Sequence, residues 1–136
     1  MSYAVASDRD RAYAFCCEFY DLVLTEHHRG MVQLKDGEVI AGICYDNFNG
    51  HNIMMHVAAK PKIRWITRQL LHEAFKYPFI TLGCQRITGW VEASNMEAQK
   101  LNHHLGFVAE ARMERAAADG GDVILYRMFR EHCRYA

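Results

Sequence analysis

His56 is the residue with a titratable side chain in the apolar run from Ile53 to Val57, and the intrinsic pKa of an imidazole is near neutral. An imidazole with that property is suited to act as a general base. A histidine on an apolar strand can equally be a hydrogen-bonded residue of the core or of the surface. The sequence therefore makes His56 a candidate base and leaves both roles open.

Cysteine is the other reactive residue type, with five copies that include the adjacent pair Cys16 and Cys17 but no CxxC motif. An odd count without paired spacing is typical of reduced thiols in a cytoplasmic protein. Cys44 and Cys84 are able to act as nucleophiles, but no sequence neighbour suggests an activating partner. The histidine pairs 27–28 and 103–104 are adjacent, so their side chains diverge. We expect no metal site.

Composition excludes several classes of protein. The chain has 136 residues, which suits one domain over residues 1–136, and its 51% apolar content excludes a disordered chain. Sixteen basic and sixteen acidic side chains cancel, so no bulk positive field exists to bind nucleic acid. No apolar stretch is long enough to span a membrane, and the first ten residues lack the core of a signal peptide. We expect a cytoplasmic location.

Hydrophobic periodicity predicts the elements that position His56. A strand over Tyr3 to Ala6 and a helix over Asp8 to Tyr20 come first. Three antiparallel strands follow, over residues 31–35, 38–45 and 53–58, and Asp36-Gly37 is a strong hairpin signal between the first two. A helix over Ile63 to Tyr77 then precedes Pro78, which ends or kinks it.

The second half alternates strands with one helix. It comprises a strand over 86–91, a helix over 96–105 with Asn95 as its cap and Gly106 behind it, and strands over 107–113 and 123–129. Two crossovers through helices then lie inside an otherwise antiparallel sheet. The fold class is α+β with a mixed sheet, a meander and a C-terminal hairpin.

The segment from Arg86 to Phe107 resembles the acyl-CoA-binding core of the GNAT superfamily of N-acetyltransferases. The strand, the Asn95 cap, the short helix and Gly106-Phe107 have the family's order and spacing. The element order from Met31 onward also resembles the GNAT fold. The branch most similar to it contains ribosomal-protein N-acetyltransferases and small GNAT proteins of bacteria and phages.

This resemblance implies a binding mode for acetyl-CoA. The cofactor would lie between the strand ending near Val57 and the strand ending near Ala93. Backbone groups of Met55, His56 and Val57 would bind the pantetheine and the acetyl carbonyl. The pyrophosphate would lie at the start of the next helix, over Arg64 to Arg68, because free N–H groups and the helix dipole attract anions there.

The family's glycine-rich phosphate loop is altered in this chain. The matching positions are Pro61, Arg64 and Ile66, so both small residues are replaced, whereas Thr67 matches the ribosomal-type branch. Two interpretations follow.

In the first, Arg64, Arg68 and Lys62 bind phosphate by charge-assisted hydrogen bonds in place of backbone contacts. In the second, these cations form a solvated helix face and the pyrophosphate site is lost. A tryptophan at a helix start, such as Trp65, is most often a packing residue or an interface anchor. The functional alternative is a contact with the adenine or the pantetheine.

The family's usual catalytic pair is also absent. Many members use a Glu on the central strand as base and a Tyr on the later helix as acid. In this chain the central strand offers His56 as the candidate base, and the Tyr position is occupied by Asn102. Asparagine cannot donate a proton as an acid, but it can hydrogen-bond the thiol or the pantetheine. Asn95 would cap its helix or contact the pantetheine. Glu92 and Tyr126 are alternative polar groups near the expected cleft.

Two functions remain open at this point. The resemblance implies a metal-free N-acetyltransferase that moves an acetyl group from acetyl-CoA to a primary amine of a protein or small molecule by direct attack. The altered loop and the missing catalytic pair favour a degenerate GNAT-fold module, such as a phage protein, that acts through a protein partner. Trp65, Trp90 and Tyr135 would offer a homodimer contact where they are exposed, and each can equally belong to the core.

Overall fold

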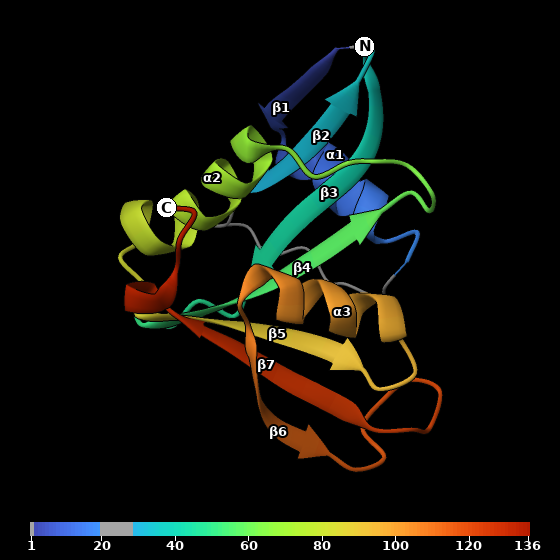
Figure 1. Cartoon of the computed structure of the whole chain (residues 1–136), viewed down its shortest axis with the longest axis vertical. Helices are drawn as coiled ribbons and strands as arrows, with labels where there is room; N and C mark the ends of the chain where they lie inside the picture. The colour runs from blue at the N-terminus through green and yellow to red at the C-terminus, as the bar shows by residue number, and fades with distance from the viewer. Residues whose placement is uncertain (1, 20–28) are drawn as a thin grey trace.

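The computed structural model describes residues 2–19 and 29–136. Within them, seven strands form one mixed sheet in the order β1-β2-β3-β4-β5-β7-β6 (Figure 1). The strands are β1 (Tyr3–Ser7), β2 (Gly30–Lys35), β3 (Glu38–Asp46), β4 (Asn52–Ala59), β5 (Arg86–Glu92), β6 (Val108–Met113) and β7 (Val123–Phe129). The helices are α1 (Arg9–Cys16), α2 (Arg68–Lys76) and α3 (Met96–Leu105), with a π-helical turn η1 (Tyr77–Thr81) and a 3-10 turn η2 (Arg130–His132).

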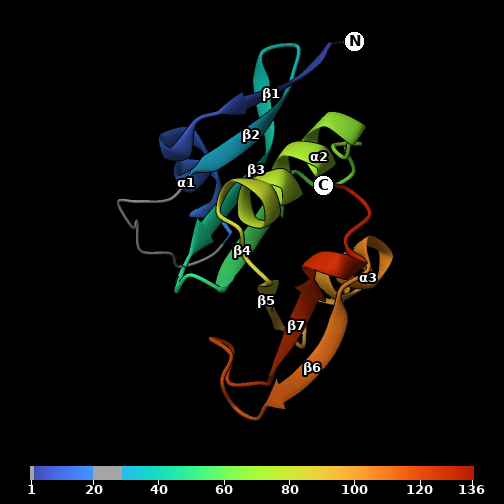
Figure 2. The same cartoon turned by 90° about the vertical axis from the view of Figure 1, so that its left-hand side faces the viewer.

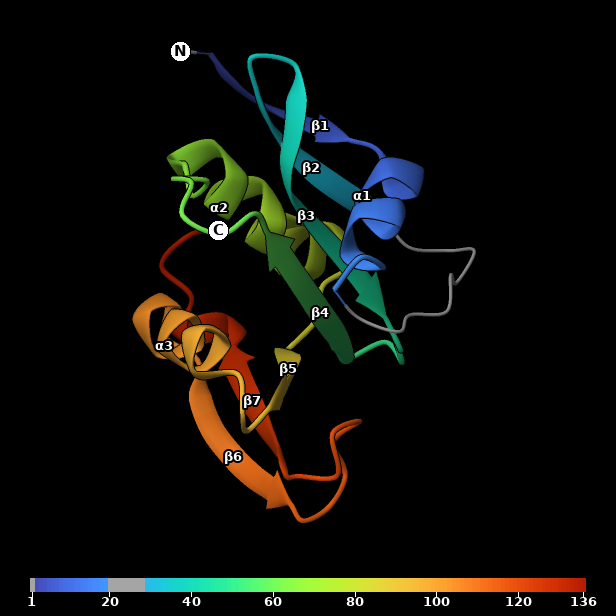
Figure 3. The same ribbon diagram turned by 90° about the vertical axis from the view of Figure 1, so that its right-hand side faces the viewer.

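The helices cover both faces of the sheet (Figures 2 and 3). Helix α1 packs on one face in a small cluster that includes Cys16, Cys44 and Ala58. Helices α2 and α3 cover the other face around a larger core that includes Met55 and Phe75. Successive residues of a strand point to opposite faces, so β4 contributes alternately to the two clusters.

Most expected elements are confirmed, including the mixed sheet. Asp36 and Gly37 both have positive φ, at 51° and 83°, as the tight hairpin between β2 and β3 requires. The Asn95 side chain accepts a hydrogen bond from the Ala98 N–H at 3.0 Å and so caps α3. Gly106 ends the same helix with φ 103°.

The start of α2 differs from the expectation. The helix begins at Arg68 and not at Ile63, with Thr67 as its N-cap. The Tyr3 hydroxyl donates to the Arg64 carbonyl at 3.0 Å, and Gln33 Nε2 donates to the Trp65 carbonyl at 2.9 Å. These carbonyls therefore bond to the strands β1 and β2, so the backbone before Thr67 stays non-helical.

The end of helix α1 also needs correction, whereas the end of α2 is close to the expected residue. Helix α1 ends at Cys16, four residues before the expected Tyr20, which lies outside the described residues. Helix α2 ends at Lys76, one residue before the expected Tyr77, and the chain then passes through Pro78 in the π-helical turn η1. Gly83, with φ 71°, follows that turn.

Candidate functional site

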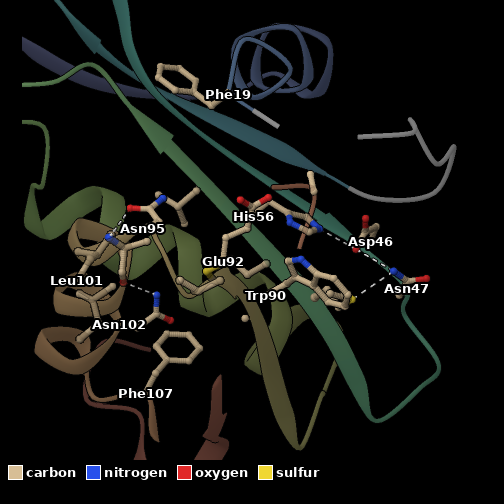
Figure 4. A pocket seen from close by; sticks show the side chains of 18 of the residues that line it. Phe19, Asp46, Asn47, His56, Trp90, Glu92, Asn95, Leu101, Asn102 and Phe107 are labelled. Carbon is tan, nitrogen blue, oxygen red and sulfur yellow. Dashed lines mark hydrogen bonds and ion pairs between the residues drawn. The ribbon is translucent and has the colours of Figure 1, made fainter. Parts of the chain in front are cut away.

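The sheet opens between its two parallel strands. Strands β4 and β5 pair only from Asn52 opposite Arg86 to Met55 opposite Gly89. Beyond that point β4 continues to Ala59 and β5 to Glu92 with no further pairing between them. A cleft of about 910 Å³ lies at this divergence (Figure 4). Its place between the ends of β4 and β5 is where the resemblance implies that acetyl-CoA lies.

The cleft has two chemically different halves, because alternate strand residues face opposite sides of the sheet. We call the side of α3 the α3 half; it is lined by apolar and amide groups, including Met55, Val57, Gly89, Val91, Asn102 and Phe107. We call the side of α1 the α1 half; it carries Glu18, Asp46, Met54, His56, Trp90 and Glu92. No Lys or Arg lines the cleft among the described residues. The carboxylates of the cleft therefore all lie in the α1 half.

His56 is held in the α1 half by a carboxylate. In the β3–β4 ladder His56 lies opposite Cys44, which makes Asp46 its diagonal neighbour on the same face. Asp46 Oδ1 lies 3.0 Å from His56 Nε2, and the two side chains are 20% and 13% exposed. The Asn47 side-chain amide also donates to Asp46 Oδ1, at 3.1 Å. Figure 4 shows this group beside the indole of Trp90, which is 40% exposed.

The α3 half depends on a glycine at the point where the strands separate. A Cβ on Gly89 would lie 3.2 Å from Asn102 Oδ1, so the missing side chain lets α3 approach β5. Asn102 Nδ2 donates to the Ala98 carbonyl at 2.8 Å, which leaves its carbonyl oxygen on the Gly89 side. Asn95 and Asn102 thus both line the cleft, and Asn95 also serves as the cap.

The two alternative polar groups separate in the structure. Glu92 lines the cleft. Tyr126 is not among the lining residues; it is buried, and its hydroxyl lies 3.2 Å from His103 Nε2. Burial raises the pKa of Tyr126, because the charged phenolate loses its hydration. Tyr126 is therefore placed to pack α3 against β7 and not to face the cleft.

The expected phosphate segment lies outside the lining of the cleft. Trp65 is partly buried and packs against the main core, and Ile66 is partly buried as well. The Thr67 hydroxyl accepts from the Leu70 N–H at 3.1 Å and from Gln33 Nε2 at 2.7 Å, so it is used internally. Arg64 and Arg68 are exposed and form no ion pair with another described residue.

The thiols do not form a nucleophilic centre. All five cysteines are free, and Cys16, Cys44 and Cys84 are buried. The hydrogen bond between Cys16 and Cys44 raises the pKa of Cys16 and lowers that of Cys44. Burial raises the pKa of Cys84. Within residues 2–19 and 29–136, no group of three metal-binding side chains occurs and no helix is long and apolar enough to cross a bilayer.

Sequence reasoning missed the residues that surround His56. Asp46, Asn47 and Trp90 were not singled out as site residues, although the register of the predicted hairpin carried the signal for Asp46. Two strands joined by the turn from Asn47 to His51 place Asp46 on the same face as His56. Trp90 required knowledge of which face of β5 opens into the cleft.

Solved structures share this architecture. A chimera built on the spermidine N-acetyltransferase SpeG of Vibrio cholerae matches at TM-score 0.77 and 16% identity, over 96% of this chain and 98% of its own. The ribosomal-protein alanine acetyltransferase of Vibrio fischeri matches at TM-score 0.72 and 14% identity, over 100% and 96%. The chain has the GNAT N-acetyltransferase fold.

A third GNAT-fold match was solved with a bound ligand. The N-acetyltransferase PseH of Campylobacter jejuni, solved in complex with acetyl coenzyme A, matches at TM-score 0.60 and 20% identity, over 77% of this chain and 70% of its own. No protein-family model and no curated protein matches the sequence. These likenesses show the fold, and the activity is argued below from the cleft.

Proposed function

We propose that this protein, as one domain, is an N-acetyltransferase that moves an acetyl group from acetyl-CoA to a primary amine of a protein or small molecule. The observation that carries the proposal is the two-sided cleft at the divergence of β4 and β5. The α3 half suits the uncharged pantetheine and thioester, since it combines apolar walls with the amides of Asn95 and Asn102. The α1 half suits a cationic amine, since it holds carboxylates and His56.

The chemistry follows from that division. An amine drawn into the α1 half becomes nucleophilic when it loses its extra proton, and its nitrogen then attacks the thioester carbon. His56 takes the proton that the nitrogen gives up as the new C–N bond forms. Backbone groups of β4 around Met55 and His56 bind the acetyl oxygen as negative charge develops on it. The C–S bond then breaks, and the leaving thiolate takes a proton from solvent.

The phosphate end of the cofactor is served by different groups. The first backbone hydrogen bond of α2 runs from the Leu71 N–H to the Thr67 carbonyl. The N–H groups of Arg68 and Gln69 come before it and have no acceptor within the helix, so they are suited to bind an anion. The side chains of Arg64 and Arg68 supply positive charge beside them. This segment fits a pyrophosphate held by side chains rather than by a glycine-rich loop.

One observation favours a second candidate, a degenerate GNAT-fold module that acts through a protein partner. Arg64 and Ile66 occupy the positions where the resembled family has small residues. Bulky side chains there restrict how closely a phosphate approaches the backbone. The two candidates differ in whether acetyl-CoA binds at all.

Thermal unfolding with and without acetyl-CoA separates them, because a ligand that binds only the native state raises its melting temperature. We expect an increase that grows with ligand concentration. Thiol release with a panel of primary amines then reports the transfer. A His56→Ala variant should lower kcat by about 100-fold or more, whereas His51→Ala, an exposed histidine outside the cleft, should not. No thermal shift at millimolar acetyl-CoA would favour the degenerate module.

A further inference from the structure

Asp46 occupies the end of β3 and receives two hydrogen-bond contacts on one oxygen. Its Oδ1 lies 3.0 Å from His56 Nε2 and 3.1 Å from Asn47 Nδ2. Both Asp46 and His56 line the cleft, and both side chains are mostly buried. The carboxylate is therefore the fixed neighbour of the imidazole.

The direction of these hydrogen bonds identifies the protonated ring nitrogen. The Asn47 Nδ2 atom also lies 3.3 Å from Met54 Sδ, and a thioether sulfur accepts but does not donate. The amide nitrogen thus faces both acceptors, and Asp46 Oδ1 is the acceptor of its N–H. An ionised carboxylate can only accept, so His56 Nε2 must carry the proton that it shares with Asp46. The other ring nitrogen, Nδ1, is then unprotonated in the neutral imidazole.

Backbone geometry holds this arrangement in place. Asn47 has φ 55°, a left-handed conformation that asparagine tolerates better than most residues. This conformation occurs directly after β3, where the Asn47 amide lies between Asp46 and Met54. The carboxylate is thus fixed from one side by Asn47 and from the other by His56.

We propose that Asp46 is a positioning residue that holds His56 as the Nε2–H tautomer and leaves Nδ1 to take the proton of the acceptor amine. The inference rests on the proposed acetyl transfer for its catalytic meaning. In the step, the N–H bond of the attacking amine breaks and an N–H bond forms at Nδ1. The Asp46 carboxylate lies beside the imidazolium that forms and stabilises it by its charge.

The tautomer can be read directly by ¹⁵N NMR of the full chain labelled at histidine, without acetyl-CoA. In the unmodified protein we expect the His56 proton on Nε2, and in Asp46→Asn we expect a mixture of tautomers. The asparagine variant should lose about 10- to 100-fold in kcat, by analogy with other residues that orient a catalytic histidine, with an unchanged KM for acetyl-CoA. Asp46→Glu should restore part of the rate.

A matched control is Asp10→Asn, a substitution of the same kind on the exposed face of α1, with a side chain 82% exposed; it should change neither the tautomer nor kcat. A His56 proton on Nδ1 in the unmodified protein would overturn the inference whatever the activity. Equal kcat for Asp46→Asn and the unmodified protein would also overturn it. The proposed function fails separately, if no amine is acetylated while the Nε2–H tautomer is present and depends on Asp46.

Discussion

The cleft and the segment before α2 differ in how their polar groups are bonded. In the cleft, Asp46 and Asn47 fix His56 beside open volume, and Glu92 lines the same space. In the segment over residues 60–67, the carbonyls of Arg64 and Trp65 bond to strand side chains, and the Thr67 hydroxyl is already used twice. The cleft therefore keeps its polar groups beside open volume, whereas the segment uses its polar groups in bonds to the strands.

For the proposed complex with acetyl-CoA, this difference predicts that different forces hold the two ends of the cofactor. The thioester end would meet a shaped cavity, where a change of volume matters most. The phosphate end would meet exposed cations, where charge matters more than shape and salt weakens the interaction. Substitutions at each end should therefore produce different kinds of defect.

The largest effect is expected from filling the cleft at Gly89. In Gly89→Val the two methyl groups must enter the space beside Asn102 Oδ1, where even a Cβ would be at 3.2 Å. We expect kcat/KM to fall by about 100-fold, with a stability cost of about 1–3 kcal/mol from overpacking. Gly89→Ala, whose single methyl needs only a small shift of the Asn102 amide, is the control and should stay within a few-fold. Full activity in a folded Gly89→Val protein would show that ligands do not use this point.

A smaller effect is expected at the phosphate end. The double change Arg64→Ala and Arg68→Ala should raise the Kd for acetyl-CoA by about tenfold or more, since hydrogen bonds to charged groups contribute about 1.5–3 kcal/mol each. Calorimetry should show no such loss for S-acetyl-pantetheine, which has no phosphate. Lys100→Ala, an exposed lysine of α3 outside the cleft, controls for net charge. Equal losses for both ligands would contradict a phosphate role.

Thr67 offers a test of stability against binding. Thr67→Val removes the hydroxyl that caps Leu70 and accepts from Gln33, so the free energy of unfolding should fall by about 1–2 kcal/mol in urea titrations. Thr67→Ser keeps the hydroxyl and should recover most of the loss. The folded Val variant should bind acetyl-CoA normally; a binding loss that exceeds the stability loss would assign Thr67 to the ligand.

The smallest effect is expected at Asp122 in the hairpin between β6 and β7, because Asp122 does not line the cleft. Hydrogen bonds from the Arg112 side chain and the Arg115 N–H lower the pKa of Asp122. A carboxyl with a lowered pKa stabilises the fold above its unfolded pKa and loses this contribution as pH falls through the folded pKa. Asp122→Asn should therefore lower the melting temperature slightly near neutral pH and reduce its fall in acid. An unchanged acid dependence would show that these exposed bonds are energetically silent.

Local signals predicted much of the fold and part of the cleft. The Asp36-Gly37 hairpin and helix α3 between Asn95 and Gly106 were placed correctly, because turn and cap residues act within a few positions of themselves. Met55, His56, Val57, Asn95 and Asn102 lie together in one cleft, as the resemblance implied, although their roles stay predictions. The predicted start of α2 was wrong, because hydrogen bonds from Tyr3 of β1 and Gln33 of β2 hold the preceding backbone outside the helix.

The sequence by itself determined the order of the elements, the GNAT resemblance and the candidate base His56, since periodicity, caps and turns are written in neighbouring residues. Only the tertiary structure decided which side chains surround that base. Asp46 reaches His56 through strand register, and Trp90 lies beside the gap that opens where β5 separates from β4 after Gly89. The hairpin of β3 and β4 carried a signal for Asp46, but the point where β5 diverges from β4 depends on packing across the whole sheet, and no local residue pattern specifies it.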